Sequence, residues 1–535
     1  MRNVLRANIH VLLATLTACS LTVGCGTGST VGKFPMASVT GTQSPLVANV
    51  TVSSPCAGQA MVEFGPDTSY GRNTASYPLP GSLQKISIQV AGMRASTTYH
   101  MRAQVSCPGG SGNSDDFTFT TGALPASPPF PALQVSRPAG TNAASSGESP
   151  GIEMIDGINF AASPMMTAFF TDRDGNVIWY YPLDSSYDSQ GIKLAPNGHI
   201  LLNLTSFTVQ NSQLREIDLA GNEIRRLDIS TLAQKMQSGG FDLVPAGFHH
   251  DMVPLDNGHL LVLVDFGKNF TDLPGYPGTT SVQGDAIVDL DANWNPVWAW
   301  NSFDHLDVNR HLEGLPDWTH SNALVYLPED GNLLVSMRHQ SWILKIDYNN
   351  GAGTGNIIWK LGNEGNFALA QGPDASLWFS FQHFPSIISR SGSQITLAVW
   401  DNGDNRILNP DGELCVPQPG SPIPQCFSRA TIFQVDESAM VANLLWAFTP
   451  TDGLPSAPGL FSVWGGSINQ LANGNVEFDV NSPINPPSPA VASEVQEVTQ
   501  TSNPQVVWKM DIPKPIFAYR AYRWSSLYPG VTWQF

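Results

Sequence analysis

The chain has 535 residues, of which 42% are hydrophobic and only 13% are charged. Aromatic residues reach 10%, which excludes disorder for most of the chain, and 48 Gly and 41 Pro argue against long helices. This composition favours many short strands and turns. A net charge of -18 disfavours a general nucleic-acid or anionic-membrane binder. An anionic small substrate remains compatible, because local charge decides what a site binds.

Residues 1–24 have the pattern of a signal peptide or lipoprotein leader. Arg2 and Arg6 precede an apolar stretch over 9–18 that is too short to span a bilayer. The stretch ends at Cys19 in a sequence similar to a bacterial lipobox, and Cys25 is a second candidate for lipidation. We therefore expect an exported protein, periplasmic or anchored as an outer-membrane lipoprotein. An ordinary signal peptide that happens to contain Cys is the alternative.

The other four cysteines fall into two sequence-local pairs. Because an exported protein meets an oxidising compartment, we expect disulfides Cys56–Cys107 and Cys415–Cys426. No CxxC spacing occurs, so a metal site built on these cysteines is disfavoured.

Residues 37–122 are predicted to form a small β module. Alternation with a period of two indicates half-buried strands, and it occurs at 47–52, 60–64, 85–90, 99–105 and 116–121. The module resembles a fibronectin type III β-sandwich. A stretch rich in Pro, Ala, Ser and Gly follows over 123–150, and we interpret it as a linker.

From residue 151 the sequence repeats two phrases. The first is a turn followed by a strand that ends near Trp, as at Trp179, Trp298, Trp359, Trp446 and Trp508, with a degenerate sixth copy at 221–225. The second is an Asn-Gly or Asp-Gly turn before an apolar strand, the strongest short hairpin signal. It occurs at 197–198, 257–258, 330–331 and 473–474.

Several short strands repeated over about 60 residues are typical of a propeller blade. The sequence therefore predicts an all-β protein: a six-bladed β-propeller over 151–535, preceded by the fibronectin type III-like β-sandwich. A plain β-sandwich or solenoid with accidental similarity is the alternative.

Three of the 11 histidines occupy similar places in the repeat. His250, His320 and His383 each lie at the entry to the strand before a hairpin, eight to eleven residues ahead of the turn glycine. In a propeller that strand is the innermost one, so three blades would direct imidazoles toward one point. A lone His is usually a surface residue or a satisfied core residue, but three in equivalent places favour a site.

Two further residues complete the candidate site. Asn322 lies two residues after His320 and therefore on the same strand face, and Arg338 follows the next hairpin. A guanidinium beside imidazoles and an amide predicts an oxyanion site for sulfate, phosphate or carboxylate. His249 and His339 are expected to point the opposite way, as packing or supporting residues.

These phrases resemble the bacterial arylsulfate sulfotransferase (arylsulfotransferase) family along most of 245–523. The resemblance rests on seven motifs in order: His249-His250-Asp251, Asp317 to Asn322, Arg338-His339-Gln340, Gln382-His383, Trp400 to Arg406, Gly465-Gly466-Ser467 and Tyr519-Arg520-Ala521. It implies transfer of a sulfuryl group from an aryl sulfate donor to a phenolic acceptor, with no nucleotide sulfate and no cofactor. It also implies a six-bladed propeller.

The resemblance assigns the transiently sulfated histidine to His383, and the other active-site residues to His250, His320, Asn322 and Arg338. Neutral imidazole is a competent nucleophile, and we assign the acid–base work to His320 rather than His250. The short stretch between Trp359 and His383 and the Cys415–Cys426 pair depart from the family pattern. These two departures concern loops over the channel, which would set the preference for donor and acceptor.

Two other readings stay open at this point. A metal-dependent lyase or hydrolase would use His250, His320 and His383 as ligands, although the positive charge of Arg338 opposes a cation there. A non-catalytic surface propeller would bind glycans or proteins. No nucleic-acid partner is expected, the membrane would be reached only through a lipid anchor, and a homodimer is one option for the assembly.

Overall fold

The computed structural model describes residues 34–534, apart from the segments 162–163, 185–186, 207–210, 416–425, 452–457 and 485–487. The described residues form a mostly β protein, in which α1 (Ile229–Ser238) is the one α-helix. None of its helices is long and apolar enough to cross a membrane. The predicted leader, with Cys19 and Cys25, lies outside the described residues.

The N-terminal module consists of two antiparallel sheets. One has the strand order β1-β2-β6, and in the other β3 pairs with β4, β5 and β7, while β7 also pairs with β8 and β9. The nine strands are β1 (Met36–Gly41), β2 (Ala48–Ser53), β3 (Gly58–Gly65), β4 (Arg72–Asn73), β5 (Tyr77–Leu79), β6 (Lys85–Val90), β7 (Thr98–Cys107), β8 (Gly110–Asn113) and β9 (Phe117–Thr120). All five predicted strand regions are confirmed.

The alternating residues of these strands supply one apolar core. Val50, Val62, Phe64 and Met101 have no exposed surface, as period-two burial requires. The predicted Cys56–Cys107 disulfide is present and joins the segment after β2 to the last residue of β7.

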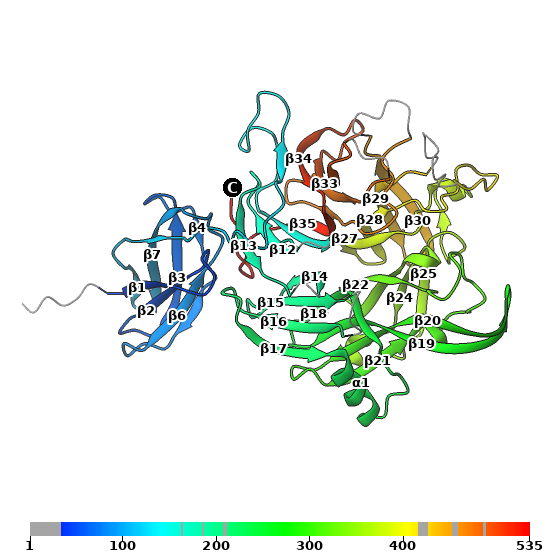
Figure 1. The fold of residues 1–535 in the computed structure, drawn as a ribbon, viewed down its shortest axis with the longest axis horizontal. Coiled ribbons are helices and arrows are strands. Elements are labelled where there is room, and N and C mark those ends of the chain that lie inside the picture. The colour runs from blue at the N-terminus through cyan, green and yellow to red at the C-terminus, as the bar shows by residue number, and fades with distance from the viewer. Residues whose placement is uncertain are drawn as a thin grey trace, which may run out of the picture. The chain divides into compact units, whose positions relative to one another are not determined.

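The rest of the described chain forms six antiparallel sheets, each with four main strands (Figure 1). The first contains β11 (Ile152–Asn159), β12 (Ala168–Thr171), β13 (Val177–Tyr181) and β35 (Ile516–Trp524); the second β14 (Asp188–Leu194), β15 (Ile200–Thr205), β16 (Gln213–Ile217) and β17 (Glu223–Asp228); the third β18 (Gly247–Pro254), β19 (Leu260–Leu273), β20 (Tyr276–Leu290) and β21 (Pro296–Asn301). The fourth contains β22 (Ser321–Leu327), β23 (Asn332–Met337), β24 (Trp342–Ile346) and β25 (Ile357–Leu361); the fifth β27 (His383–Ser391), β28 (Gln394–Asp401), β29 (Arg429–Asp436) and β30 (Val441–Phe448); the sixth β31 (Ile468–Gln470), β32 (Val476–Asn481), β33 (Val491–Val498) and β34 (Val506–Pro513).

Short strands extend two of these sheets. β26 (Ala368–Leu369) pairs in parallel with β30, and β10 (Gln134–Ser136) pairs with β34. In the first sheet the spatial order of the strands is β13-β12-β11-β35. The C-terminal strand β35 therefore occupies the edge that the first strand occupies in the other sheets. We call β35, β14, β18, β22, β27 and β31 the first strands, and β13, β17, β21, β25, β30 and β34 the fourth strands.

The predicted hairpins join first and second strands, with β31–β32 joined by the turn at Gly474. Gly198, Gly258 and Gly474 all have φ of 85°, a left-handed conformation that favours glycine in such turns. The phrase that ends near Trp forms the fourth strand of every sheet, and the degenerate copy forms β17.

Side chains of the fourth strands connect consecutive sheets. The indole Nε1 of Trp179 donates to the Leu219 carbonyl in the second sheet at 2.8 Å, and that of Trp300 donates to Gly355 in the fourth at 2.9 Å. The same atom of Trp359, Trp446 and Trp508 donates to Glu437, Thr501 and Arg173. Each acceptor lies in the connection that precedes the next sheet's fourth strand.

The link between the second and third sheets comes from the degenerate copy of the repeat. Arg225 stands where the other copies have Trp, and its Nη1 donates to the Ala292 carbonyl between β20 and β21 at 2.6 Å. Its guanidinium also lies over the Trp294 ring, 4.2 Å from the centroid. Because Trp508 of the sixth sheet donates to Arg173 of the first, the six links close into a ring of sheets.

The segment 123–150, predicted as a linker, is not free chain. It contains β10, Arg137 pairs with buried Glu148 at 2.5 Å, and the Phe130 ring packs edge-on against Phe169. Pro and Gly can punctuate packed chain as well as flexible linkers, so this composition does not tell whether a linker is ordered. The second predicted disulfide, Cys415–Cys426, is also present, and both its sulfur-bearing residues are buried.

Candidate functional site

The three predicted histidines lie at the beginnings of neighbouring first strands. His250 is in β18, His320 immediately precedes β22, and His383 is the first residue of β27. The strand pairing is irregular at each place: between Phe248 and Met252, between Ser321 and Ala323, and between His383 and Ser386. Such bulges redirect side chains, and they are common beside active sites.

Backbone conformation shows that the three positions are only approximately equivalent. His250 and His320 have φ of 56° and 49°, in the left-handed region that costs a non-glycine residue about 1 kcal/mol or more. In β27 the left-handed residue is Phe384, with φ of 44°, so His383 lies one residue before the kink. Turn spacing in the sequence could not show this offset.

The histidines nevertheless share one cluster. The ring centroids of His250 and His320 are 4.8 Å apart. The Tyr519 ring of β35 lies 5.6 Å from His250 and 6.3 Å from His383, and therefore joins the third histidine to the other two. Tyr519 is 2% exposed, and burial raises the pKa of its hydroxyl above the ordinary value.

His383 is held as a neutral imidazole with a defined tautomer. Its Nδ1–H donates to Oδ1 of Asn402 at 2.7 Å, and its Nε2 accepts the Gly465 N–H at 3.2 Å. The side chain is 1% exposed. Burial, and then the positive charge of Arg338, lowers the pKa of His383 well below the ordinary value. Nε2 therefore keeps its lone pair at neutral pH.

Asn402 can orient His383 because its own amide is fixed. Its Nδ2 donates to the carbonyls of Ser462 and Gly465 at 2.9 and 3.0 Å, which leaves Oδ1 for the imidazole. The backbone that presents the Gly465 N–H is constrained in turn, because a side chain at Gly466, where φ is 104°, would overlap the Trp400 ring.

His250 is connected to a buried carboxylate through its neighbour. The Nδ1 atoms of His249 and His250 are 2.8 Å apart, and Nε2 of His249 lies 3.3 Å from Asp285. Although burial opposes it, Asp285 raises the pKa of His249, whereas burial and the neighbouring His320 lower that of His250 well below the ordinary value. The shared proton therefore belongs to His249, and neutral His250 carries its own proton on Nε2.

His320 belongs to a carboxylate–imidazole pair. Its Nδ1–H donates to Asp317 at 2.5 Å, so Nε2 is the atom that can exchange a proton. The His339 ring lies 4.6 Å from that of His320, and its Nδ1 donates to the Asp317 carbonyl at 2.8 Å. Burial, then His320 and Arg338, lowers the pKa of His339 to about 4.

The expected orientation of His249 and His339 is therefore wrong. Both take part in the cluster instead of pointing away from it, because the irregular strand ends break the simple alternation of faces. Among the described residues, the potential metal ligands whose atoms lie within 4.8 Å of one another are Asp317, His320 and His339. This set differs from the three histidines that the metal-enzyme reading required.

Arg338 follows β23 as the first residue of the short 3-10 helix η2 (Arg338–Gln340). Its Nη2 donates to the Val463 carbonyl at 2.8 Å, and its Nη1 contacts Nε2 of His339. Nε is buried without a hydrogen-bond partner in the described part of the chain. Asp404 lies 3.7 Å away, and because burial raises its pKa to about 7 it only partly cancels the guanidinium charge.

A second guanidinium, that of Arg520 in β35, contacts residues of the cluster. It pairs with buried Asp251 at 3.0 Å and donates to the Asn322 carbonyl. Lys193 also pairs with Asp251, at 2.9 Å, so two cations share one carboxylate. Asn322 is fully buried, its Nδ2 donates to the Gln382 carbonyl at 2.8 Å, and its Oδ1 has no partner within the described residues.

The structure thus brings all five predicted site residues into one cluster, in which Asn322, Arg338 and His383 are buried and His250 and His320 are partly exposed. Sequence reasoning gave no role to Asp317, Asn402, Tyr519 or Arg520. Each of them lies inside a motif on which the resemblance rests, which was the available signal. Their partners could not be read from spacing, because Asn402 and Gly465 are 63 residues apart and Arg520 and Asp251 are 269 apart.

The neutral imidazoles of His250 and His383, beside two guanidiniums and a buried amide, suit the binding of a small oxyanion. The family model described as arylsulfotransferase (ASST) matches residues 145–520. The chain belongs to this family of arylsulfate sulfotransferases, and membership implies arylsulfotransferase activity with aryl sulfate substrates. A comparison with curated proteins gives no match.

Several solved structures resemble the chain distantly. A protein of unknown function from Bacteroides caccae is 12% identical, with a TM-score of 0.39, and covers 70% of this chain and 98% of its own. A rhamnogalacturonan lyase of Bacillus licheniformis is 10% identical, with a TM-score of 0.32 and coverages of 94% and 91%. A quinoprotein alcohol dehydrogenase-like protein from Bacteroides thetaiotaomicron is 10% identical, with a TM-score of 0.31 and coverages of 86% and 91%. Likeness at this level carries no argument about function.

Proposed function

We propose that the protein moves a sulfuryl group from an aryl sulfate to a phenol in two displacements, through a sulfated His383 and without a nucleotide sulfate. The observation that carries this proposal is the state of His383. A buried, neutral imidazole whose Nδ1–H is held by Asn402 has its nucleophilic lone pair on Nε2.

In the first displacement, Nε2 of His383 attacks the sulfur, the N–S bond forms, and the bond between sulfur and the aryl oxygen breaks. The electron pair leaves with the phenoxide, and the imidazole ring takes up positive charge that the Nδ1–H shares with Asn402 Oδ1. The Gly465 N–H, which bonds Nε2 at 3.2 Å in the resting site, is released and can donate to a sulfuryl oxygen.

The three sulfuryl oxygens need fixed donors. The Nε–H of Arg338 and the Nε2–H of His250 are available for this, and a preorganised donor of this kind is typically worth about 3 kcal/mol in the transition state. The Arg338 guanidinium also offers the planar geometry that matches an oxyanion.

His320 is better suited than His250 to acid–base work. Its Nδ1–H is held by Asp317, so in the imidazolium form the second proton lies on Nε2 and can pass to the departing phenoxide; the neutral Nε2 that remains then takes the proton of the incoming phenol. His250 accepts a hydrogen bond from His249 on Nδ1, and its depressed pKa keeps it neutral, with the Nε2–H as its donor.

We further propose that the six sheets are the blades of a six-bladed β-propeller and that the N-terminal module is a fibronectin type III-like sandwich. Support for the propeller comes from the closed series of links between fourth strands and from the shared cluster at the first strands. We also propose export as a lipoprotein through Cys19 or Cys25, which the two disulfides fit.

The decisive experiment mixes the enzyme with 4-nitrophenyl sulfate and no acceptor. We expect about one equivalent of 4-nitrophenol in a burst, and an acid-labile adduct of about 80 Da on the peptide that contains His383. His383→Asn should remove both, whereas His100→Asn, a change at a half-exposed histidine of the N-terminal module, should leave both intact.

Initial rates with donor and acceptor should follow a ping-pong pattern. An adduct on His250 or His320 would mean that the roles are wrongly assigned. Sequential kinetics with no adduct would instead favour direct transfer and would refute the covalent mechanism.

A further inference from the structure

Three aromatic rings outside the histidine cluster contact one another. The Phe160 ring centroid lies 5.9 Å from that of Trp464 and 5.6 Å from that of Phe517, and the last two are 6.3 Å apart. All three distances lie in the range of attractive aromatic pairs. We call Phe160, Trp464 and Phe517 the aromatic triad.

The aromatic triad is open to solvent. Phe160 is 60% exposed, and Trp464 and Phe517 are partly exposed. Covering this aromatic surface with another apolar group would be favourable, because it removes apolar area from water. A patch of this kind favours a binding site over a purely structural contact.

The triad lies at the same end of the first strands as the histidines. Phe517 is the second residue of β35, and Phe160 directly follows β11, whose last residue pairs with the first residue of β35. Trp464 precedes β31 by a few residues. The triad therefore comes from the first and sixth sheets, and the histidines come from the beginnings of the first strands in the third, fourth and fifth sheets.

Trp464 connects the triad to the residues that would do the chemistry. The Val463 carbonyl accepts a hydrogen bond from Arg338 at 2.8 Å, and the Gly465 N–H donates to Nε2 of His383 at 3.2 Å. Trp464 lies between these two residues in the chain. An aryl ring on the triad would therefore place its sulfate toward Arg338 and His383.

The backbone that carries two of the rings is held by hydrogen bonds. The Trp464 carbonyl accepts from the Ser462 hydroxyl at 3.1 Å. Next to Phe160, the Asn159 N–H donates to the Asp188 carboxylate at 3.1 Å. A ligand would therefore meet rings whose backbones lose little freedom on binding.

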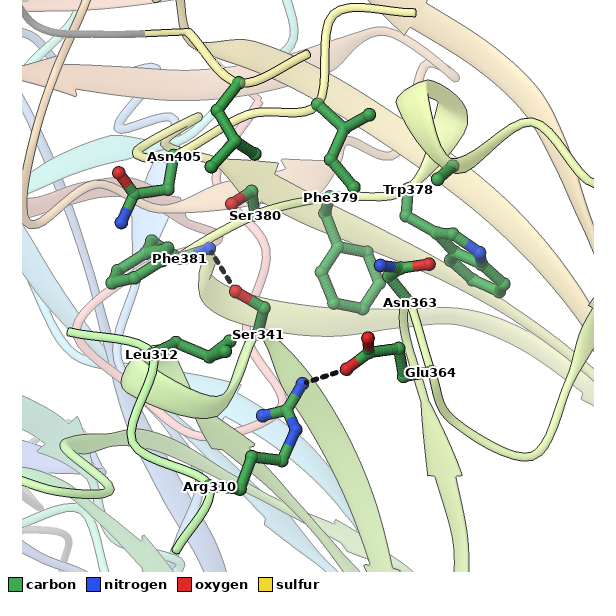
Figure 2. Close-up of a pocket in the computed structure, with 13 residues that line it drawn as sticks. Arg310, Leu312, Ser341, Asn363, Glu364, Trp378, Phe379, Ser380, Phe381 and Asn405 are labelled. Atoms are coloured by element: carbon green, nitrogen blue, oxygen red, sulfur yellow. Dashed lines mark hydrogen bonds and ion pairs between the residues drawn. The ribbon is translucent and has the colours of Figure 1, made fainter. Parts of the chain in front are cut away.

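A second aromatic-lined place is less suited to the reacting ring. It is a cavity of about 400 Å³ whose lining includes Trp378, Phe379 and Phe381 (Figure 2). The Phe381 ring centroid also lies 5.2 Å from the Arg338 guanidinium, so this ring stands between the cavity and the candidate site. A phenol held there could not present its oxygen to a sulfur on His383.

We propose that the aromatic triad is the single place that binds the aryl ring of both substrates, first that of the sulfate donor and then that of the phenolic acceptor. The proposal rests on the proposed sulfuryl transfer and adds which residues recognise the ring. A ping-pong exchange between two phenols needs only one aryl place, because the first phenol leaves before the second binds.

The second displacement follows from this placement. The acceptor's ring takes the place that the donor's phenol has left, with its hydroxyl directed toward the sulfated His383. The phenol oxygen bonds to sulfur, the N–S bond breaks, and its electron pair returns to Nε2 of His383. His320 takes the phenol proton, so the same ring contacts serve both half-reactions.

The test removes one ring of the triad and leaves the histidine cluster untouched. Phe160→Ala changes an exposed side chain and should not endanger the fold. Ile224→Ala, at a residue of β17 that is 50% exposed, is the matched control. We measure the 4-nitrophenyl sulfate concentration that half-saturates the burst rate and the 2-naphthol concentration that half-saturates discharge of the sulfated enzyme. Calorimetry gives the dissociation constant of 2-naphthol from the unsulfated enzyme.

We expect Phe160→Ala to raise both half-saturating concentrations and the dissociation constant by similar factors, about threefold to tenfold, while the maximal burst rate changes little. Phe160→Tyr, which keeps the ring, should recover most of the affinity. Ile224→Ala should behave as the wild type.

Three results would overturn the proposal. A rise for one substrate alone would mean two aryl places, and a lower maximal burst rate with unchanged half-saturation would make Phe160 a positioning residue. Unchanged values throughout would mean that the triad does not bind the ring. If the wild type gives no burst, the proposed sulfuryl transfer fails, and calorimetry on the wild type and Phe160→Ala still decides whether the triad binds a phenol.

Discussion

The first and fourth strands of the six sheets are built on opposite principles. At the fourth strands each side-chain donor has an acceptor in the next sheet, and the one missing Trp is replaced by Arg225, which makes the same kind of link. At the first strands two histidines have left-handed backbones, and among the described residues a buried guanidinium nitrogen lacks a hydrogen-bond partner, whereas irregular strand pairing occurs in both regions. The ring of satisfied contacts supports the strained site, which is the pattern expected where function opposes local stability.

The largest effect is expected from Arg338→Lys. The change keeps the charge but removes the planar donors, so kcat/KM should fall about 100-fold or more while the melting temperature changes little. Arg225→Lys is the matched change at a fourth strand and should leave turnover unaltered. Near wild-type turnover in Arg338→Lys would assign this guanidinium to the structural group instead.

The next effect concerns a positioning residue. Asn402→Ala removes the acceptor for the His383 Nδ1–H, so both tautomers become populated and the burst rate should fall about tenfold or more. The acceptor KM should stay the same. Stopped-flow measurement of the burst separates this from a purely structural role, which would lower the folded fraction without changing the rate per active site.

The pH dependence of the burst tests how His383 is kept neutral. An ordinary imidazole with a pKa near 6.5 would be about one-quarter neutral at pH 6. Because burial and then Arg338 depress the pKa of His383 well below that value, the neutral form persists as pH falls, and the burst rate should be nearly flat from about pH 7.5 to 6. A fourfold fall over this range, with the fold intact by circular dichroism, would contradict the depressed pKa.

The smallest effect on activity is expected at the fourth strands. Trp508→Phe keeps most of the buried ring but removes the hydrogen bond to the Arg173 carbonyl, and it should reduce the free energy of unfolding by about 1–2 kcal/mol. Turnover per folded molecule should be unchanged. A large loss of turnover would show that the ring of links also tunes the site, and the two regions would then not be separable.

Much of the fold was predictable because its signals are local. Asn-Gly turns, period-two alternation and the phrase that ends near Trp each act within about ten residues, and they predicted the hairpins, the fourth strands and the strands of the N-terminal module. The two disulfides were predictable because each pair is close in sequence within an expected module. The ordered structure within 123–150 was not predictable from composition. β10 gains its order from pairing with a strand more than 300 residues away.

The sequence by itself determined which residue types reach the site: three histidines at strand entries, Asn322 two residues after one of them, and Arg338 after the following hairpin. Only the tertiary structure decided how these side chains are paired. Asn402 meets His383 across neighbouring strands, Asp285 reaches His250 through His249, and Tyr519 and Arg520 enter from the last strand of the chain. Such pairings depend on ring closure and on irregular strand ends, where a one-residue offset redirects a side chain and no local periodicity records it.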